Sequence, residues 1–264
     1  MFSIVEEDRY LELKALHQAR ITQHPLMNAI LSGVQKGLVY ESPDASAVLV
    51  CARSGFSLLS MAKKMPPGYC ADFWHFLQGN NELPSYIHIY SPPASLVTHV
   101  TAKWDKHKLR RRVQFRCHRS LPTYDYERLL PADHSISPVQ AIGCDRLEQA
   151  FNLRLCDRYW DSAEDFLAKA IGVCIVDPTD LPLAICYSAC VVDGVAEMDT
   201  FVAPEHRGRR LMRIVSEPFF NLALTAGLTP HWDTFVANVP SYRLAQKFGL
   251  SPVHEYDLLS VVLR

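Results

Sequence analysis

The stretch DTFVAPEHRGRRLMRIV, residues 199–215, begins with a strand pattern and ends with a helix pattern. Between the two lie one proline, one glycine and three arginines, namely Arg207, Arg209 and Arg210. The first turn of a helix carries four backbone N–H groups without intrahelical partners and about half a positive charge. Arginines added there favour a strongly anionic ligand, and a phosphate or pyrophosphate is the usual one. The stretch therefore predicts an anion-binding loop between a strand and a helix.

Sharply patterned segments surround this loop. Alternating apolar residues predict strands, an Asp-Gly pair at 193 and 194 predicts a hairpin turn, and Gly227 and Gly249 are natural helix ends. The predicted order is three strands, the loop, a long helix, a strand, a short helix and a last strand. These segments occupy residues 171–176, 183–192, 195–202, 210–226, 232–237, 241–248 and 253–263.

The first part of the chain mixes helices and strands without a motif that carries chemistry. Its patterns predict helices near residues 6–22, 25–37, 71–80 and 96–112, and strands near 38–41, 46–53, 56–61 and 86–91. A polar, proline-bearing stretch at 119–138 is the candidate linker. We therefore expect an α/β (α+β) protein with an amino-terminal domain at 1–125 and a second domain at 126–264. No internal sequence repeat is visible.

Composition limits the classes of function. The chain has 264 residues, 48% of them hydrophobic, which is typical of a globular protein with an ample core. A net charge of -1 argues against a general nucleic-acid or membrane binder, and no apolar run approaches the ~20 residues that cross a bilayer. The eight cysteines form no C-x-x-C pair, which predicts reduced thiols rather than a disulfide frame or zinc site. We expect a cytoplasmic protein without a metal.

The segments VAPEHRGRRL (202–211) and NVPSYRLAQKFGL (238–250) resemble the GNAT superfamily of acetyl-CoA-dependent N-acetyltransferases. The order of segments from about residue 138 to the end is similar to the core of that fold. A looser resemblance, carried by HPLMNAILSGVQKGLVYES at 24–42, is to a bacterial subgroup of two-part GNAT proteins. The resemblance implies a mixed, mostly antiparallel central sheet flanked by helices, preceded by a second, smaller α/β half.

The resemblance also implies a binding site for acetyl-CoA as cosubstrate. The backbone N–H groups of residues 207–211 can point at one pyrophosphate, with Gly208 allowing close approach. In the family, the pantetheine arm pairs with the strand before the loop, as an added strand would. Asn238 is expected to bind the pantetheine, to cap the last helix, or to do both. The expected cofactor-binding residues are Phe201, Val202, Ala203, Arg207, Gly208, Arg209, Arg210, Leu211 and Asn238.

Two positions depart from the family pattern. Arg210 replaces a second small residue of the loop, where it could crowd the phosphate or add a bidentate clamp. Many family members carry a tyrosine on the last helix that protonates the leaving thiolate, and Ala245 occupies that position here. The nearest phenol in the sequence is that of Tyr242, on another face of the helix. The general acid is therefore left open, and Ser241 or a water is expected to meet the thiolate.

Two carboxylates on the strand before the loop are candidates for the general base. Glu197 and Asp199 lie two residues apart, so their side chains share one face of the strand. Either could accept a proton from the amine, directly or through a water. The alternative is a polar strand face that pairs with arginines. We favour Glu197 as the catalytic base and Ser241 as its catalytic partner at the thiolate.

The function expected from these features is transfer of an acetyl group from acetyl-CoA to a primary amine by direct attack, since no nucleophile motif lies near the loop. The acceptor is a small molecule or peptide of unknown identity, and the sequence does not indicate the oligomeric state. One alternative is a non-catalytic acyl-CoA-binding or sensor protein, suggested by Ala245 and Arg210. Another is acetylation of aminoacyl-tRNA, hinted at by the basic stretch at 103–119, although such charge runs more often face solvent.

Overall fold

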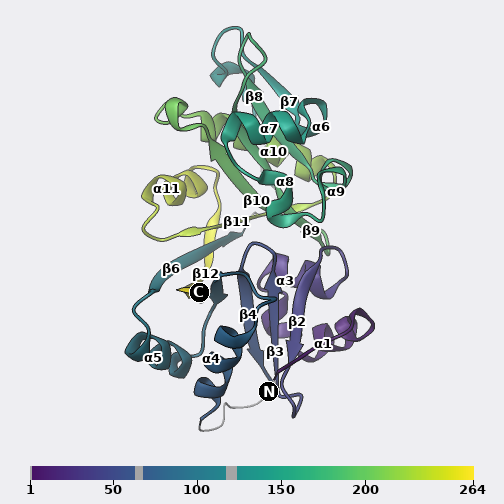
Figure 1. Cartoon of the computed structure of the whole chain (residues 1–264). Helices are drawn as coiled ribbons and strands as arrows, with labels where there is room; N and C mark the ends of the chain where they lie inside the picture. The colour runs from purple at the N-terminus through teal and green to yellow at the C-terminus, as the bar shows by residue number, and fades with distance from the viewer. Residues whose placement is uncertain (1, 63–67, 117–123) are drawn as a thin grey trace. The chain divides into compact units, whose positions relative to one another are not determined.

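The computed structural model of the chain describes residues 2–62, 68–116 and 124–264. It contains two compact units. The first comprises Met1–Val113 with Phe235–Ala237 and His254–Arg264, and the second comprises Gln114–Thr234 with Asn238–Val253. Two carboxyl-terminal segments thus belong to the first unit, as the yellow strand β12 in Figure 1 illustrates. The expected boundary between residues 125 and 126 stays a prediction about independent domains.

The first unit is built on a sheet of order β1-β2-β3-β4-β5-β12-β6. Neighbours are antiparallel from β1 to β4, β4 and β5 are parallel, and β12 runs antiparallel to β5. The strands are β1 (Ser3–Ile4), β2 (Gly37–Glu41), β3 (Ala47–Ala52), β4 (Phe56–Met61), β5 (Tyr86–Tyr90), β6 (His107–Arg116) and β12 (Ser251–Val262). The helices are η1 (Glu7–Arg9), α1 (Tyr10–Leu16), α2 (Gln18–Ile21), α3 (Pro25–Leu31), α4 (Tyr69–Gly79) and α5 (Ala94–Lys103).

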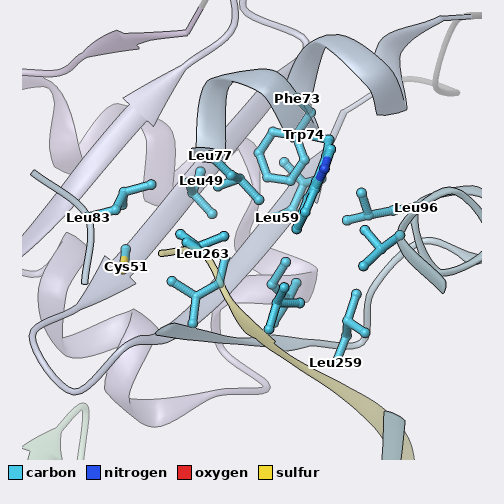
Figure 2. Close-up of a cluster of buried hydrophobic side chains, with 14 of the residues drawn as sticks. Leu49, Cys51, Leu59, Phe73, Trp74, Leu77, Leu83, Leu96, Leu259 and Leu263 are labelled. Carbon is cyan, nitrogen blue, oxygen red and sulfur yellow. The ribbon is translucent and has the colours of Figure 1, made fainter. Parts of the chain in front are cut away.

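One core of this unit lies between one face of the sheet and helices α4 and α5, and α3 packs on the other face against β3. Figure 2 shows Phe73, Trp74 and Leu77 of α4 directed toward apolar side chains of the strands. Leu259 of β12 is fully buried in the same cluster, together with Leu96 of α5. The carboxyl-terminal strand therefore completes the first unit's core, because alternate residues of β12 supply part of its apolar surface.

The second unit has strand order β11-β10-β9-β8-β7. All its neighbours are antiparallel except the parallel pair β10 and β11. The strands are β7 (Ser135–Pro138), β8 (Gly172–Val176), β9 (Pro182–Val192), β10 (Val195–Val202) and β11 (Thr229–Phe235). The helices are η2 (Glu127–Leu129), α6 (Val139–Ile142), α7 (Cys144–Phe151), α8 (Leu155–Tyr159), α9 (Ala163–Lys169), η3 (Pro204–His206), α10 (Leu211–Thr225) and α11 (Val239–Lys247).

Helices cover both faces of this second sheet. Helix α10 packs on β8, β9 and β10, with Phe219 and Val215 fully buried in the shared core (Figure 1). On the other face, the indole N–H of Trp160 donates to the carbonyl of Ser188 at 3.2 Å, and the rings of Phe166 and Tyr187 are 5.7 Å apart. The α/β class with a mostly antiparallel, helix-flanked sheet is confirmed.

One predicted helix is wrong over half its length. The segment 96–112 was expected to be helical, but α5 ends at Lys103 and β6 begins at His107. Residues 107–111 are mostly exposed, whereas Val113, Gln114 and Phe115 are buried in succession, so the end of the strand is covered on both faces. The basic run therefore lies on a strand.

The two units repeat one order of elements, although the sequence has no visible repeat. Three antiparallel strands, a helix, a parallel strand, a helix and a strand occur as β2 to β6 and again as β8 to β12. Among the cysteines, Cys51, Cys174, Cys186 and Cys190 are buried free thiols, as expected. Cys144 is disulfide-bonded, which the scattered spacing did not indicate.

Candidate active-site cleft

The central strands of the second unit part from each other. The parallel pair of β10 and β11 runs from Val195↔Thr229 to Glu197↔His231, whereas β10 continues to Val202. On its other edge, β10 stays paired with β9 as far as Val202. The β11-facing edge of β10 beyond residue 197 therefore offers backbone groups to another extended chain, such as the amides of a pantetheine arm.

A β-bulge lies at the point where the strands part. Glu197 pairs with Cys190 and Met198 pairs with Ser188, so Ala189 is an extra residue on β9. A bulge bends the strand and increases its local twist. Strands β10 and β11 therefore separate beside a β-bulge and not at the end of either strand.

The predicted anion-binding loop follows β10 and has a backbone that points amides outward. Gly208 has φ +80° and Arg210 has φ 63°, both in the left-handed region. A Cβ at Gly208 would meet no heavy atom within 4 Å, so the conformation and not space demands glycine. The N–H groups of Arg213 and Ile214 both donate to the Arg210 carbonyl, so the amides before them are the open start of α10.

Loop, helices and strand end enclose a cleft with a volume of about 990 Å³. Seven expected residues line it: Phe201, Val202, Arg207, Gly208, Arg210, Leu211 and Asn238. The remaining expected residues, Ala203, Arg209, Glu197 and Ser241, are not among the lining residues. The sequence thus placed most of the cofactor-binding set around one cavity, and the roles of all eleven residues stay predictions.

The cleft is strongly cationic. Its lining includes Arg207, Arg210, Arg213, Arg243 and Lys247, and no acidic residue is among the residues that line it. Arg213 forms an ion pair with Glu217 at 3.0 Å, so the positive charge of the lining comes mainly from the other four cations. Arg243 and Lys247 were not among the residues expected from the sequence. Their spacing of four residues on α11, which places both side chains on one helix face, was the available signal.

Two further groups fit an anionic, amide-bearing ligand. The Arg207 Nε donates to the Val202 carbonyl at 3.4 Å, and its guanidinium lies 5.8 Å from the centre of the Phe201 ring. The Nδ1 of His206, which also lines the cleft, is buried and has no hydrogen-bond partner in the described part of the chain. A buried unpaired ring nitrogen is costly, so a bound ligand that pairs with it is favoured.

Asn238 caps helix α11. Its side-chain oxygen accepts a hydrogen bond from the N–H of Ser241 at 3.4 Å, and Pro240 occupies the first turn. One of the two expected roles of Asn238 is thus present, and its position in the cleft lining is compatible with the other.

The two candidate bases have different surroundings. Asp199 accepts hydrogen bonds from the Tyr187 hydroxyl at 3.2 Å and from the Thr200 N–H at 2.9 Å, and it pairs with Arg158 at 3.3 Å. These partners match the alternative of a polar strand face that pairs with arginine, and the role of Asp199 stays a prediction.

Glu197 lies at the last paired position of β10 and β11, at the closed end of the parting. Its Oε2 accepts from the Cys190 thiol at 3.7 Å. Burial, followed by repulsion from the Glu197 carboxylate, raises the pKa of the Cys190 thiol well above its usual value. The thiol therefore remains protonated and able to donate to Glu197.

The candidate groups for the thiolate are mostly buried. Ser241 is 8% exposed, and its hydroxyl accepts from the Trp232 Nε1 at 3.2 Å. Ala245, where the family tyrosine is expected, is completely buried. Tyr242 packs edge-on against Phe115 with 5.0 Å between ring centroids. The residues lining the cleft include no tyrosine.

Neither a metal-binding cluster nor a membrane-spanning helix occurs among the residues that the structure describes. In residues 2–62, 68–116 and 124–264, no three His, Cys, Asp or Glu side chains are grouped so that they could hold a metal ion. Over the same residues, no helix combines the length and apolarity needed to cross a membrane.

Comparisons with known proteins agree with this architecture. The family model described as GNAT acetyltransferase matches residues 92–259. An uncharacterized N-acetyltransferase of Bacillus subtilis, YdfB, is 31% identical over 109 residues, which are 41% of each chain. The match therefore spans less than half of that relative.

Solved structures share the whole fold at low sequence identity. A GCN5-related N-acetyltransferase-like protein from Streptococcus suis has a TM-score of 0.73 at 16% identity, covering 97% of this chain and 100% of its own. A tandem GNAT protein from the clavulanic acid biosynthesis pathway has a TM-score of 0.62 at 12% identity, covering 100% and 98%. Because the family model matches well over half of the chain, the chain belongs to the GNAT acetyltransferase family, as a two-part member.

Proposed function

We propose that the protein transfers an acetyl group from acetyl-CoA to a primary amine by direct attack. The observation that carries this proposal is the cationic cleft at the parting of β10 and β11, which joins an anion-binding loop to an open strand edge. A molecule with phosphates at one end and an extended amide arm at the other fits both features. A cytoplasmic location stays a prediction.

In the proposed binding mode, the phosphates lie at the start of α10. The Arg207 N–H donates to the Pro204 carbonyl at 3.3 Å, so the amides of residues 208–211 are the ones proposed to donate to the pyrophosphate. The side chains of Arg207, Arg210, Arg243 and Lys247 supply charge to the cleft. The pantetheine amides pair with residues 201–203 of β10, beyond the last β11 partner. This direction places the thioester toward the closed end of the parting, where Glu197 lies.

In the proposed reaction, the neutral amine nitrogen attacks the thioester carbonyl carbon, the C–S bond breaks so that a thiolate leaves, and the nitrogen loses its second proton to water as the amide forms. Glu197, directly or through a water, accepts the proton that the ammonium must lose. The Cys190 thiol donates a hydrogen bond to the Glu197 carboxylate and so helps to fix the position of that side chain. A water or Ser241 protonates the departing thiolate, whose ordinary pKa near 8.5 makes it a tolerable leaving group without a dedicated acid.

A second candidate function is acyl-CoA binding without turnover. It is favoured by Ala245, which is buried where the family's acid is expected, and by the lack of a tyrosine among the lining residues. The two candidates differ in one measurable property, since a sensor binds acetyl-CoA without consuming it.

The deciding experiment measures free thiol released from acetyl-CoA in the presence of a library of primary amines, with mass spectrometry of the acetylated products. Amine-dependent release that is stoichiometric with product supports the enzyme. Calorimetric binding of acetyl-CoA with no release above the protein-free rate for any amine class supports the sensor. Absence of acetyl-CoA binding would exclude both.

A further inference from the structure

The sheet of the first unit has a second face, opposite the core under α4 and α5. Leu259 and Val261 of β12 belong to that core, so Ser260 between them points to the other side. There the Ser260 hydroxyl is 2.8 Å from Nδ1 of His88 on β5 and accepts from Arg110 of β6 at 3.3 Å. Three adjacent strands thus present polar side chains on this second face.

Aromatic rings and arginines form a continuous surface around these contacts. The rings of Tyr86 and His88 are 5.4 Å apart, and those of His88 and Phe56 are 5.0 Å apart. The Arg112 guanidinium lies 5.8 Å from the Phe56 ring and 4.7 Å from the Phe235 ring, over which Arg110 lies at 4.0 Å. We call this the aromatic–arginine face: Phe56, Tyr86, His88, Arg110, Arg112 and Phe235.

The face is accessible to a partner. Tyr86 is 47% exposed, Arg110 is exposed, and Phe56, His88 and Phe235 are half-buried. Helix α3 covers the part of this face over β3, where Val48 and Val50 are buried, and the Phe56 ring stacks on the buried Tyr90 ring at 5.3 Å. Tyr86 and Arg110 lie beyond that packing and remain exposed, so core packing does not account for them.

Charge on the face is positive. Strand alternation places Lys108, Arg110 and Arg112 on one side of β6, each about 7 Å from the next. Arg111 points to the other side, where it pairs with Glu255 and Asp257, both at 3.5 Å. These two carboxylates of β12 therefore neutralise the opposite side of β6.

We propose that the aromatic–arginine face binds single-stranded nucleic acid. Exposed rings on a sheet provide stacking platforms for unpaired bases, and a row of lysine and arginine neutralises the backbone phosphates. The chain's net charge of -1 provides no general attraction for a polyanion, so the proposed binding rests on the local cations and rings of this face. An acidic peptide would use the cations without the rings, and a second copy of the chain would place cations against cations.

The test is fluorescence anisotropy with a labelled RNA strand of about a dozen nucleotides, compared with the same strand in a duplex. The double variant Arg110→Glu, Arg112→Glu removes two cations of the face. Its matched control, Arg128→Glu, Arg146→Glu, makes the same charge change at two exposed, ion-paired arginines of the second unit. Tyr86→Ala tests stacking, with Tyr126→Ala as its control.

We expect the single strand to bind more tightly than the duplex, and the double variant to weaken it at least tenfold. For the double variant, the slope of the logarithm of the binding constant against the logarithm of salt concentration should decrease in magnitude by about 1.4, as expected for two lost phosphate contacts on a single strand. Tyr86→Ala should weaken binding roughly fivefold or more. All titrations contain excess CoA, which is expected to occupy the cationic cleft of the second unit. RNA bound in that cleft is then displaced and does not contribute to the anisotropy.

Three results would overturn the proposal. The first is no binding at low salt, and the second is an equal loss in the Arg128→Glu, Arg146→Glu control. The third is binding that ignores Tyr86→Ala and favours an acidic peptide over RNA. Melting curves of each variant verify folding, and sizing by light scattering shows whether the face instead joins two copies, which would also refute RNA binding.

Discussion

Reversing the charge of Arg207 tests the cleft most directly. In the free protein this side chain makes two weak contacts, a 3.4 Å hydrogen bond to the Val202 carbonyl and a ring contact at 5.8 Å with Phe201. Losing a hydrogen bond of this kind costs about 1 kcal/mol of folding stability or less. Arg207→Glu should therefore fold normally, and changes in CoA affinity will report the cleft itself.

The loss of affinity follows from charge. A charge-assisted hydrogen bond to a phosphate contributes about 1.5–3 kcal/mol, and tenfold in Kd corresponds to about 1.4 kcal/mol. Arg207→Glu also adds a like charge beside the phosphates, among the cations that remain. We expect Arg207→Glu to bind CoA at least tenfold more weakly than the parent. The CoA affinity of Arg207→Gln should lie between those of Arg207→Glu and the parent.

Isothermal titration calorimetry with CoA at about physiological salt measures the effect, since low salt would exaggerate surface electrostatics. Arg128→Glu is the control, because Arg128 is exposed, ion-paired with Asp125 and outside the cleft lining. An unchanged Kd for Arg207→Glu, or an equal change in the control, would refute the assignment of the phosphate site to this loop.

Four further predictions concern the catalytic groups and the first unit. Glu197→Gln should lower the acetyl-transfer rate most near neutral pH and recover partly at alkaline pH, whereas a profile parallel to the parent's would make Glu197 structural. Ser241→Ala should cost about 1–3 kcal/mol of stability, because the buried Trp232 N–H loses its acceptor. Under saturating acetyl-CoA Tyr242→Phe should have little effect, and a large loss confined to it would return the acid role to a phenol. Burial lowers the pKa of His17 below its ordinary value near 6.5, so the folded chain holds it neutral and stability should fall as pH drops below that value. Calorimetric melts should show that the stability of His17→Asn depends less on pH between neutrality and pH 5 than the stability of the parent does. Equal slopes of stability against pH in the two proteins would contradict this cause.

The sequence predicted the loop well because its chemistry is local. A strand end, a glycine and several arginines before a helix are contiguous in the chain, and they line one cleft in the structure. Arg243 and Lys247 were missed because their contribution depends on which face of α11 meets the cavity, and that is decided by packing far away in sequence.

Non-local pairing also hid two features of the fold. Residues 107–112 are rich in cations and carry no strong strand signal by themselves, yet they form β6 beside β12, a strand at the far end of the chain. The repeated order of elements in the two units was invisible because it resides in hydrogen-bonding topology and not in residue identity.

The repeated order of elements allows the strands beside the cleft to be compared with their counterparts in the first unit. Each unit contains a parallel strand pair with a register of three residues, β4 with β5 in the first and β10 with β11 in the second. A short parallel pair by itself therefore does not account for the cleft. In the first unit, the register of β3 and β4 is continuous from Ala47↔Met61 to Cys51↔Ser57. In the second, the bulge opposite Glu197 interrupts the corresponding pair, twists β10 at the parting and is followed by the cationic loop. We therefore expect the proposed site to depend on the bulge and the loop together, because the bulge lies where the unpaired edge of β10 begins and the loop carries the positive charge proposed to hold a ligand there.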